Sequence, residues 1–134
     1  MKLEEILGHP GQALTEELYE LTIAAFADGV EPMPGALELI AALRDAAIPI
    51  GLVSNSTRAF VDAALARAGL ADAFAVTVVG EEVAAPKPAP DTYLAAAAAL
   101  GVDPAACIVL EDSPTGVEAG RAAGMRTIGV PSLD

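Results

Sequence analysis

The sequence predicts an α/β fold in which an open parallel sheet is flanked by helices. Four short apolar runs alternate with segments of helical periodicity, and none of the runs alternates cleanly between apolar and polar residues. Strands of this kind are typical of parallel sheets that helices cover on both faces. Because ligands of such sheets bind beyond the carboxyl ends of the strands, the residues directly after each run are the first candidates for function.

The order of the elements follows from periodicity and from turn residues. Residues 14–28 have helical spacing, and Pro34 begins a second helix that ends near residue 47. Further helices are expected to end at Gly69 and to cover residues 91–100 and 115–123. The expected strands are the apolar runs 48–53, 75–79, 107–110 and 126–130.

Composition and charge exclude several classes of partner. The 134 residues, enough for one domain, include seven Lys and Arg against nineteen Asp and Glu, and the net charge of −12 disfavours nucleic acid and anionic membranes. No apolar run reaches the roughly 18 residues that span a bilayer, and the first residues lack the pattern of a signal peptide. The chain has a single cysteine, Cys107, which excludes an intrachain disulfide, and a single histidine, His9, so a His/Cys metal site is excluded as well. We therefore expect a cytoplasmic protein.

The apolar residues are mostly small. Thirty alanines and five aromatic residues predict a core of small side chains.

Two adjacent carboxylates, Glu111 and Asp112, follow the third apolar run. Neighbouring carboxylates repel each other unless a cation lies between them, and oxygen ligands at a strand end suit Mg²⁺. Taken alone, the pair is better explained as an exposed acidic loop, because acidic residues are common in this chain.

Two further strand-end features would suit a phosphate group. Lys87, one of only two lysines, lies between Pro86 and Pro88, and a fixed ammonium is a good partner for a phosphoryl group. Ser54 and Asn55 follow the first run, where a hydroxyl and the N–H groups of a helix N-terminus could bind an anion. Singly, these residues could be a solvated lysine and an ordinary helix cap. Together with the acidic pair they predict a pocket for a phosphate and a divalent cation, whereas Tyr93 is assigned to a surface or packing role.

At this point the sequence resembles the haloacid-dehalogenase-like hydrolases. The resemblance is closest to the branch that contains phosphoglycolate phosphatase and β-phosphoglucomutase. Three segments are similar to motifs two, three and four of the family: Leu52-Val53-Ser54-Asn55-Ser56, Ala85-Pro86-Lys87-Pro88-Ala89-Pro90-Asp91 and Leu110-Glu111-Asp112-Ser113-Pro114-Thr115-Gly116. The resemblance implies a Rossmann-like core over residues 33–134, preceded by part of a helical cap over residues 1–32.

The resemblance also implies roles for the site residues. Ser54 would hydrogen-bond the transferring phosphoryl group, and Asn55 would help to orient it. Lys87 would neutralise that group and steady the nucleophile, while Asp112, with Glu111, would hold Mg²⁺ directly or through water. The implied activity is that of a Mg²⁺-dependent phosphatase, which acts on a small phosphorylated metabolite through an aspartyl-phosphate. The alternative is a non-catalytic relative that keeps the phosphate and cation pocket for a regulatory role.

One part of the family pattern is absent from this sequence. The first motif, D-x-D-G-T, carries the nucleophile, and no two of the eight aspartates here lie two positions apart. In the family its strand lies between the strand that ends at Ser54 and the strand that ends at Glu111, so two strand edges would be left unpaired. The edges could close on each other, a second copy could supply a strand by self-association, or the natural chain begins further upstream, which is the simplest account. We therefore predict that the 134-residue chain alone is an inactive fragment.

Overall fold

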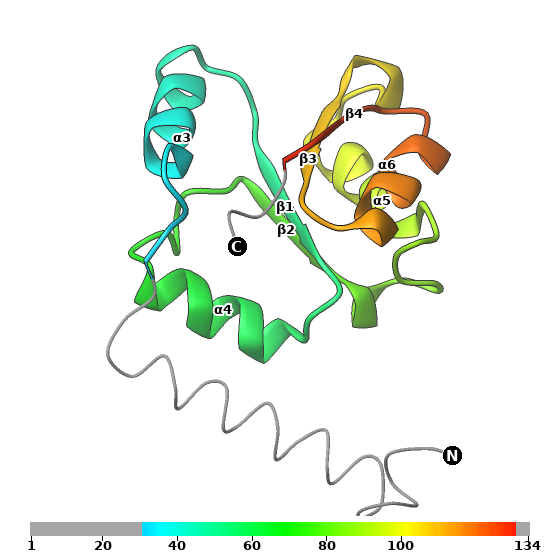
Figure 1. The fold of residues 1–134 in the computed structure, drawn as a ribbon, viewed down its shortest axis with the longest axis horizontal. Coiled ribbons are helices and arrows are strands. Elements are labelled where there is room, and N and C mark those ends of the chain that lie inside the picture. The colour runs from blue at the N-terminus through cyan, green and yellow to red at the C-terminus, as the bar shows by residue number, and fades with distance from the viewer. Residues whose placement is uncertain (1–30, 131–134) are drawn as a thin grey trace, which may run out of the picture.

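The structure is a computed structural model that describes residues 31–130, in which parallel strands alternate with helices (Figure 1). The elements, in chain order, are α3 (Ala36–Asp45), β1 (Gly51–Ser54), α4 (Arg58–Arg67), β2 (Val76–Val79), the 3₁₀ helix η1 (Gly80–Glu82), α5 (Asp91–Leu100), the 3₁₀ helix η2 (Pro104–Ala106), β3 (Ile108–Glu111), α6 (Pro114–Ala122) and β4 (Arg126–Gly129). The predicted α/β alternation is confirmed. The helix expected over residues 14–28, and most of the expected cap segment 1–32, lie outside the described residues. Over residues 31–130, no helix is both long and apolar enough to cross a membrane.

The strands form two parallel pairs instead of one continuous sheet. β1 pairs with β2, and β3 pairs with β4. The division falls between β1 and β3, where the family resemblance places the strand of the first motif. The strand edges have therefore not closed on each other.

Backbone hydrogen bonds show which groups point into the space between β1 and β3. The carbonyl of Ile50 accepts from the N–H of Ala75 at 3.0 Å. Because successive residues of a strand direct their N–H and C=O groups to opposite sides, those of Gly51 and Val53 point away from β2. The carbonyl of Cys107 accepts from the N–H of Arg126 on β4 at 3.2 Å. By the same rule, the N–H and C=O groups of Ile108 and Leu110 point away from β4. An extended segment between β1 and β3 could pair with both edges.

Helices α5 and α6 cover one face of the strands. α5 contacts β1 and β2, while α6 contacts β3 and β4. Their shared core consists of Tyr93, Ala97, Val109, Ala119, Ala123 and Met125. The largest fully buried side chains are Val79 and Thr92, in keeping with the alanine-rich composition. α3 and α4 lie on the other side of β1 and β2 (Figure 1).

The expectation that helices cover both faces of the strands is wrong for β3 and β4. Val109 and Glu111 are buried against α5 and α6, but the alternate residues Ile108 and Leu110 are 60% and 49% exposed. Ile128, which is in register with Leu110, is 44% exposed. The physical reason is that the described helices next to these strands lie on one face only.

Element bounds differ from the predictions by at most about three residues, and α5 begins and ends as predicted. Ser54 is the last residue of β1 and Glu111 is the last residue of β3, whereas both were expected to come directly after their strands. This one-residue shift matters for the site, because the residues of a strand point alternately to its two faces. Glu111 therefore points to the same face as Val109, toward the helices.

Close contact between α6 and the strands depends on Gly120. A Cβ at this position would lie 2.6 Å from Oγ1 of Thr127 and 3.3 Å from a methyl group of Val109. We expect Gly120→Ala to lower the free energy of unfolding by up to about 2 kcal/mol, because an overpacking cost of about 1–3 kcal/mol is set against a gain of about 1 kcal/mol in helix propensity. Urea unfolding followed by circular dichroism would measure this. Gly129→Ala is the matched control, since a Cβ there meets no atom within 4 Å; an equal loss in both variants would contradict the packing argument.

Candidate functional site

The site is organised around Lys87, whose ammonium joins the two strand pairs. Its Nζ donates to the backbone carbonyl of Val53 on β1 at 3.3 Å, and it forms a salt bridge with Oε1 of Glu111 on β3. The side chains of Lys87 and Glu111 are only 9% and 8% exposed. Two strands that do not pair with each other are thus connected at their carboxyl ends by one buried ion pair.

Asn55 fixes the backbone of the loop that carries Lys87. Its Oδ1 accepts from the N–H of Lys87 at 3.0 Å, and its Nδ2 donates to the carbonyl of Lys87 at 3.1 Å. Gly80 packs closely here, because a Cβ would lie 3.1 Å from Pro86 and 3.4 Å from Asn55. In this structure, Asn55 therefore holds the lysine loop in place.

The N-terminus of α4 is capped by side chains other than those predicted. Thr57 is the cap residue and accepts from the N–H of Phe60 at 3.2 Å, while Oε1 of Glu81 accepts from the N–H of Arg58 at 2.7 Å. The interpretation of Ser54 and Asn55 as an ordinary helix cap is therefore wrong. These two N–H groups, which the sequence offered for an anion, thus already have side-chain acceptors in this structure. The Ser54 hydroxyl oxygen accepts from the N–H of Ser56 at 3.1 Å and still has a proton to donate.

The carboxylate of Glu111 accepts hydrogen bonds on both oxygens. Oε1 accepts from Lys87 and from the hydroxyl of Tyr93, the latter at 2.6 Å. Oε2 accepts from the N–H of Asp112 at 3.2 Å and from the N–H and hydroxyl of Ser113 at 3.4 and 3.2 Å. Burial alone would raise the pKa of Glu111, but the hydrogen bonds from Lys87 and Tyr93 outweigh burial and lower that pKa. The group is therefore a carboxylate at neutral pH.

Glycine is required next to this carboxylate at the start of α6. A Cβ on Gly116 would lie 2.0 to 2.3 Å from the carboxyl atoms of Glu111. The N–H of Gly116 donates to the hydroxyl of Ser113 at 3.1 Å, which caps the helix. The motif Glu111 to Gly116 thus folds into a strand end, a helix cap and a gap for one buried carboxylate.

Sequence reasoning missed Tyr93 as a member of the site. Its side chain is 7% exposed, and the centre of its ring lies 5.4 Å from Nζ of Lys87. Burial, and then the neighbouring Glu111, raise the pKa of Tyr93, so its hydroxyl stays protonated and donates to Glu111. The available signal was its position in the first turn of the helix that follows Lys87, although nothing local distinguishes such a tyrosine from a core residue.

Asp112 is the second carboxylate at this strand end and is exposed. It lies beside a groove of about 850 Å³ that is also lined by Ser113, Val117, Arg121 and Val130. Over residues 31–130, no three His, Cys, Asp or Glu side chains are grouped so that they could hold a metal ion. Mg²⁺ needs only one or two protein carboxylates, because water and phosphate oxygens complete its octahedron. Asp112, with Glu111 behind it, therefore suits Mg²⁺ in its donor chemistry, although both oxygens of Glu111 already accept from the protein.

Comparison with known proteins gives consistent results. A family model described as haloacid dehalogenase-like hydrolase matches residues 2–124. A bifunctional riboflavin kinase/FMN phosphatase from Arabidopsis thaliana is 44% identical over 118 residues, which are 87% of this chain and 31% of that protein. The crystal structure of CbbY from Rhodobacter sphaeroides in complex with phosphate has a TM-score of 0.87 at 30% identity, covering 93% of this chain and 57% of that chain. A β-phosphoglucomutase structure from Clostridium difficile has a TM-score of 0.78 at 27% identity, covering 87% and 52%.

The chain belongs to the haloacid dehalogenase-like hydrolases, since the family model spans most of its length. Within that family it falls in the branch that contains β-phosphoglucomutase and phosphoglycolate phosphatase, to which its structural relatives point. The resemblance found in the sequence is confirmed. The chain spans between 31% and 57% of the length of the three proteins described above.

The ion pair leads to a prediction about pH. Because the pKa of Glu111 is lower in the folded chain than in the unfolded chain, its charge stabilises the fold above the ordinary glutamate value of about 4.3. This stabilisation is lost as the pH falls through the lowered pKa. We expect Glu111→Gln to lower the free energy of unfolding by about 3 kcal/mol at pH 7, because it leaves the Lys87 ammonium buried without its partner.

The difference between the parent chain and Glu111→Gln should therefore shrink at pH 3 and below. Urea unfolding at pH 7, 5, 4 and 3 would measure it, because the other carboxylates titrate in both chains and cancel. Glu38→Gln is the matched control, since Glu38 is exposed in the first turn of α3 and its loss should change stability by about 0.5 kcal/mol or less. A pH-independent difference would contradict the charged state assigned to Glu111.

Proposed function

We propose that this chain is part of a Mg²⁺-dependent phosphatase of a small phosphorylated metabolite, which forms an aspartyl-phosphate in the complete protein. One observation carries the proposal: Lys87 bridges the carboxyl ends of β1 and β3, where Ser54 and the Glu111–Asp112 pair also lie. A hydroxyl, an ammonium and a cation-binding carboxylate at one end of parallel strands are what phosphoryl transfer needs.

Each residue has a role that follows from its charge and its surroundings. Lys87, held by Val53 and Glu111, would neutralise an incoming phosphoryl group, and Ser54 would donate a hydrogen bond to one of its oxygens. Asp112, with Glu111, would hold Mg²⁺. When bound, the cation would screen the negative charge of the phosphoryl oxygens. Asn55 would keep Lys87 in place through the two hydrogen bonds to its backbone.

The nucleophile is proposed to come from a strand between β1 and β3. Such a strand would satisfy the N–H of Val53 and the backbone groups of Gly51, Ile108 and Leu110 that point into this space, each of which costs about 1–3 kcal/mol if it is buried without a partner. A side chain at its carboxyl end would lie beside Lys87. The sequence of 134 residues has no D-x-D pair, so we propose that the aspartate lies on a segment outside this sequence.

The relatives support phosphate esters as substrates. One relative is named an FMN phosphatase, and the CbbY structure contains phosphate. The net charge of −12 makes a polyanionic partner unfavourable, which also supports a small metabolite as the substrate.

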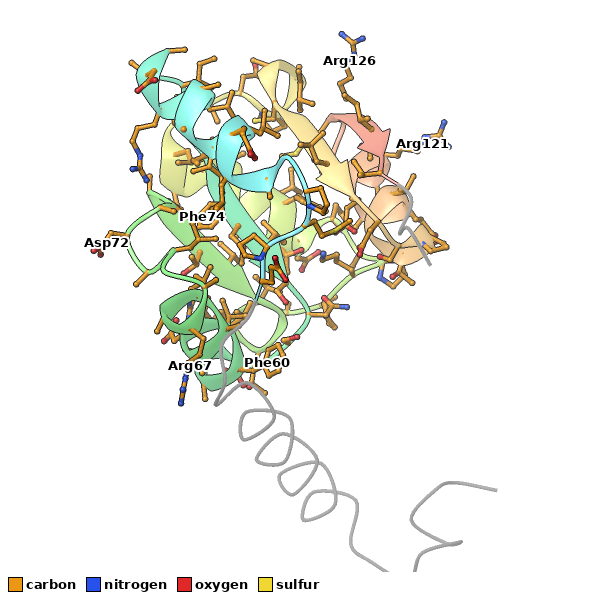
Figure 2. The ribbon with its side chains drawn as sticks, turned by 60° about the vertical axis from the view of Figure 1, so that its left-hand side comes forward. Phe60, Arg67, Asp72, Phe74, Arg121 and Arg126 are labelled. Carbon is orange, nitrogen blue, oxygen red and sulfur yellow. The ribbon has the colours of Figure 1, made fainter. Side chains whose placement is uncertain are left out.

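Hydrolysis of p-nitrophenyl phosphate with Mg²⁺ tests this function. We expect no turnover by the 134-residue chain, and turnover by a longer chain in which a D-x-D-G-T segment precedes this sequence. In the longer chain, Lys87→Met and Asp112→Asn should each lower kcat/KM about 100-fold or more, because each removes a charge that would stabilise the transition state. Asp72→Asn is the matched control, since Asp72 lies on the outer loop before β2 (Figure 2). Turnover by the 134-residue chain that Asp112→Asn abolishes would contradict the proposal that it is inactive alone.

A second candidate function is a non-catalytic pocket that binds phosphate and a cation for regulation. The absence of a D-x-D pair favours it. It predicts that the 134-residue chain folds cooperatively and binds inorganic phosphate and Mg²⁺ in calorimetry, with Mg²⁺ binding weakened about tenfold or more by Asp112→Asn but not by Asp72→Asn. Binding without turnover in the longer chain would support this function, whereas a folded chain that binds neither ligand would exclude it.

A further inference from the structure

We propose that Tyr93 is a positioning residue of this site: its hydroxyl fixes the carboxylate of Glu111, and through Glu111 it fixes the ammonium of Lys87. This inference rests on the proposed function, because Lys87 is the group that would neutralise the phosphoryl group. It adds a residue that the sequence motifs do not include, from the first turn of α5.

The geometry places Tyr93 against both charged groups. Its hydroxyl donates to Oε1 of Glu111 at 2.6 Å, and Lys87 binds the same oxygen. The ring itself lies 5.4 Å from Nζ of Lys87, within the range at which an aromatic face attracts a cation. The ammonium of Lys87 is thus held by the carboxylate of Glu111 and by the ring of Tyr93, and the hydroxyl of that ring donates to the same carboxylate.

The other oxygen of Glu111 explains why the hydroxyl matters. Oε2 is bound by Asp112 and Ser113 at the start of α6, so one end of the carboxylate is fixed to that helix. On Oε1, the donors are Lys87 and Tyr93. Without the hydroxyl, Oε1 would keep Lys87 as its donor but would lose the hydrogen bond that fixes its own position. The ammonium would then lose the fixed acceptor that holds it between β1 and β3.

A packing role alone does not require this hydroxyl. The ring lies in the core with Ala97, Val109 and Met125, and a phenylalanine would fill the same space. The neighbouring residue provides a contrast, because Thr92 is fully buried on the same helix and its hydroxyl oxygen has no hydrogen-bond partner among the described residues. Two hydroxyls on α5 can therefore be removed separately, one that donates to Glu111 and one that has no hydrogen-bond partner among the described residues.

The experiment measures the chemical accessibility of Lys87 in the full 134-residue chain. The sequence contains only two lysines, so brief labelling with an amine-specific acetylating reagent and mass spectrometry give the rate at Lys87 relative to Lys2. In the parent chain, Lys87 should react more slowly than Lys2, because its side chain is 9% exposed and paired. Tyr93→Phe should raise the relative rate at Lys87 about tenfold, which is the scale of one hydrogen bond to a charged group.

Three further variants distinguish positioning from packing. Thr92→Val removes the other buried hydroxyl of α5 and should leave the relative rate at Lys87 unchanged. Glu111→Gln should raise it, and Tyr93→Phe should then add nothing in the Glu111→Gln background, because the hydroxyl acts through that carboxylate.

Several outcomes would overturn the proposal. These are equal labelling of Lys87 and Lys2 in the parent chain, no rise in Tyr93→Phe, an equal rise in Thr92→Val, or a full additional rise in the double variant. Loss of cooperative unfolding in Tyr93→Phe would also overturn it, since the hydroxyl would then serve the fold and not the position of Lys87. The labelling needs no phosphate, cation or turnover, so its result is independent of whether the longer chain proves to be a phosphatase.

Discussion

The rest of the site depends on the buried ion pair between Lys87 and Glu111. β1 and β3 belong to separate strand pairs, and the lysine that contacts Val53 on one and Glu111 on the other connects their carboxyl ends. Desolvating two charges is costly, and the cost is offset only when the remaining hydrogen-bonding capacity is satisfied. Glu111 meets this condition, because both of its oxygens accept from neutral donors in addition to Lys87.

A second cluster of hydrogen bonds, formed by Arg58, connects the start of α4 with β2 and with the residues that follow β2. The guanidinium of Arg58 on α4 donates to Glu82 at 2.7 and 2.9 Å and to the carbonyl of Thr77 on β2 at 2.8 Å. The hydrogen bond from Arg58 lowers the pKa of Glu82. Because this pair is partly exposed, its contribution to stability is small, but its geometry ties the turn after β1 to the end of β2. The turn that carries Asn55 is thereby held close to the loop of Lys87.

The sequence could predict the elements but not the contacts between them. Periodicity and turn residues were sufficient for α5 and for the four strands, because these signals are local. The contact between Asn55 and Lys87 joins residues 32 positions apart, and no local pattern encodes it. The same holds for Tyr93, whose partner Glu111 is 18 positions away. The exposed face of β3 was also unpredictable, because a short apolar run has the same appearance whether one or both faces are covered.

The strand period explains how two adjacent carboxylates acquire different environments. Glu111 is the last residue of β3 and points to the same buried face as Val109, where the protein supplies its donors. Asp112 follows the strand and is exposed beside the groove. A divalent cation at Asp112 would therefore lie next to a Lys87–Glu111 pair that is already neutral overall, and it would not have to compensate two free negative charges. In this arrangement Glu111 is the buried carboxylate that pairs with Lys87, and Asp112 is the exposed carboxylate beside the groove.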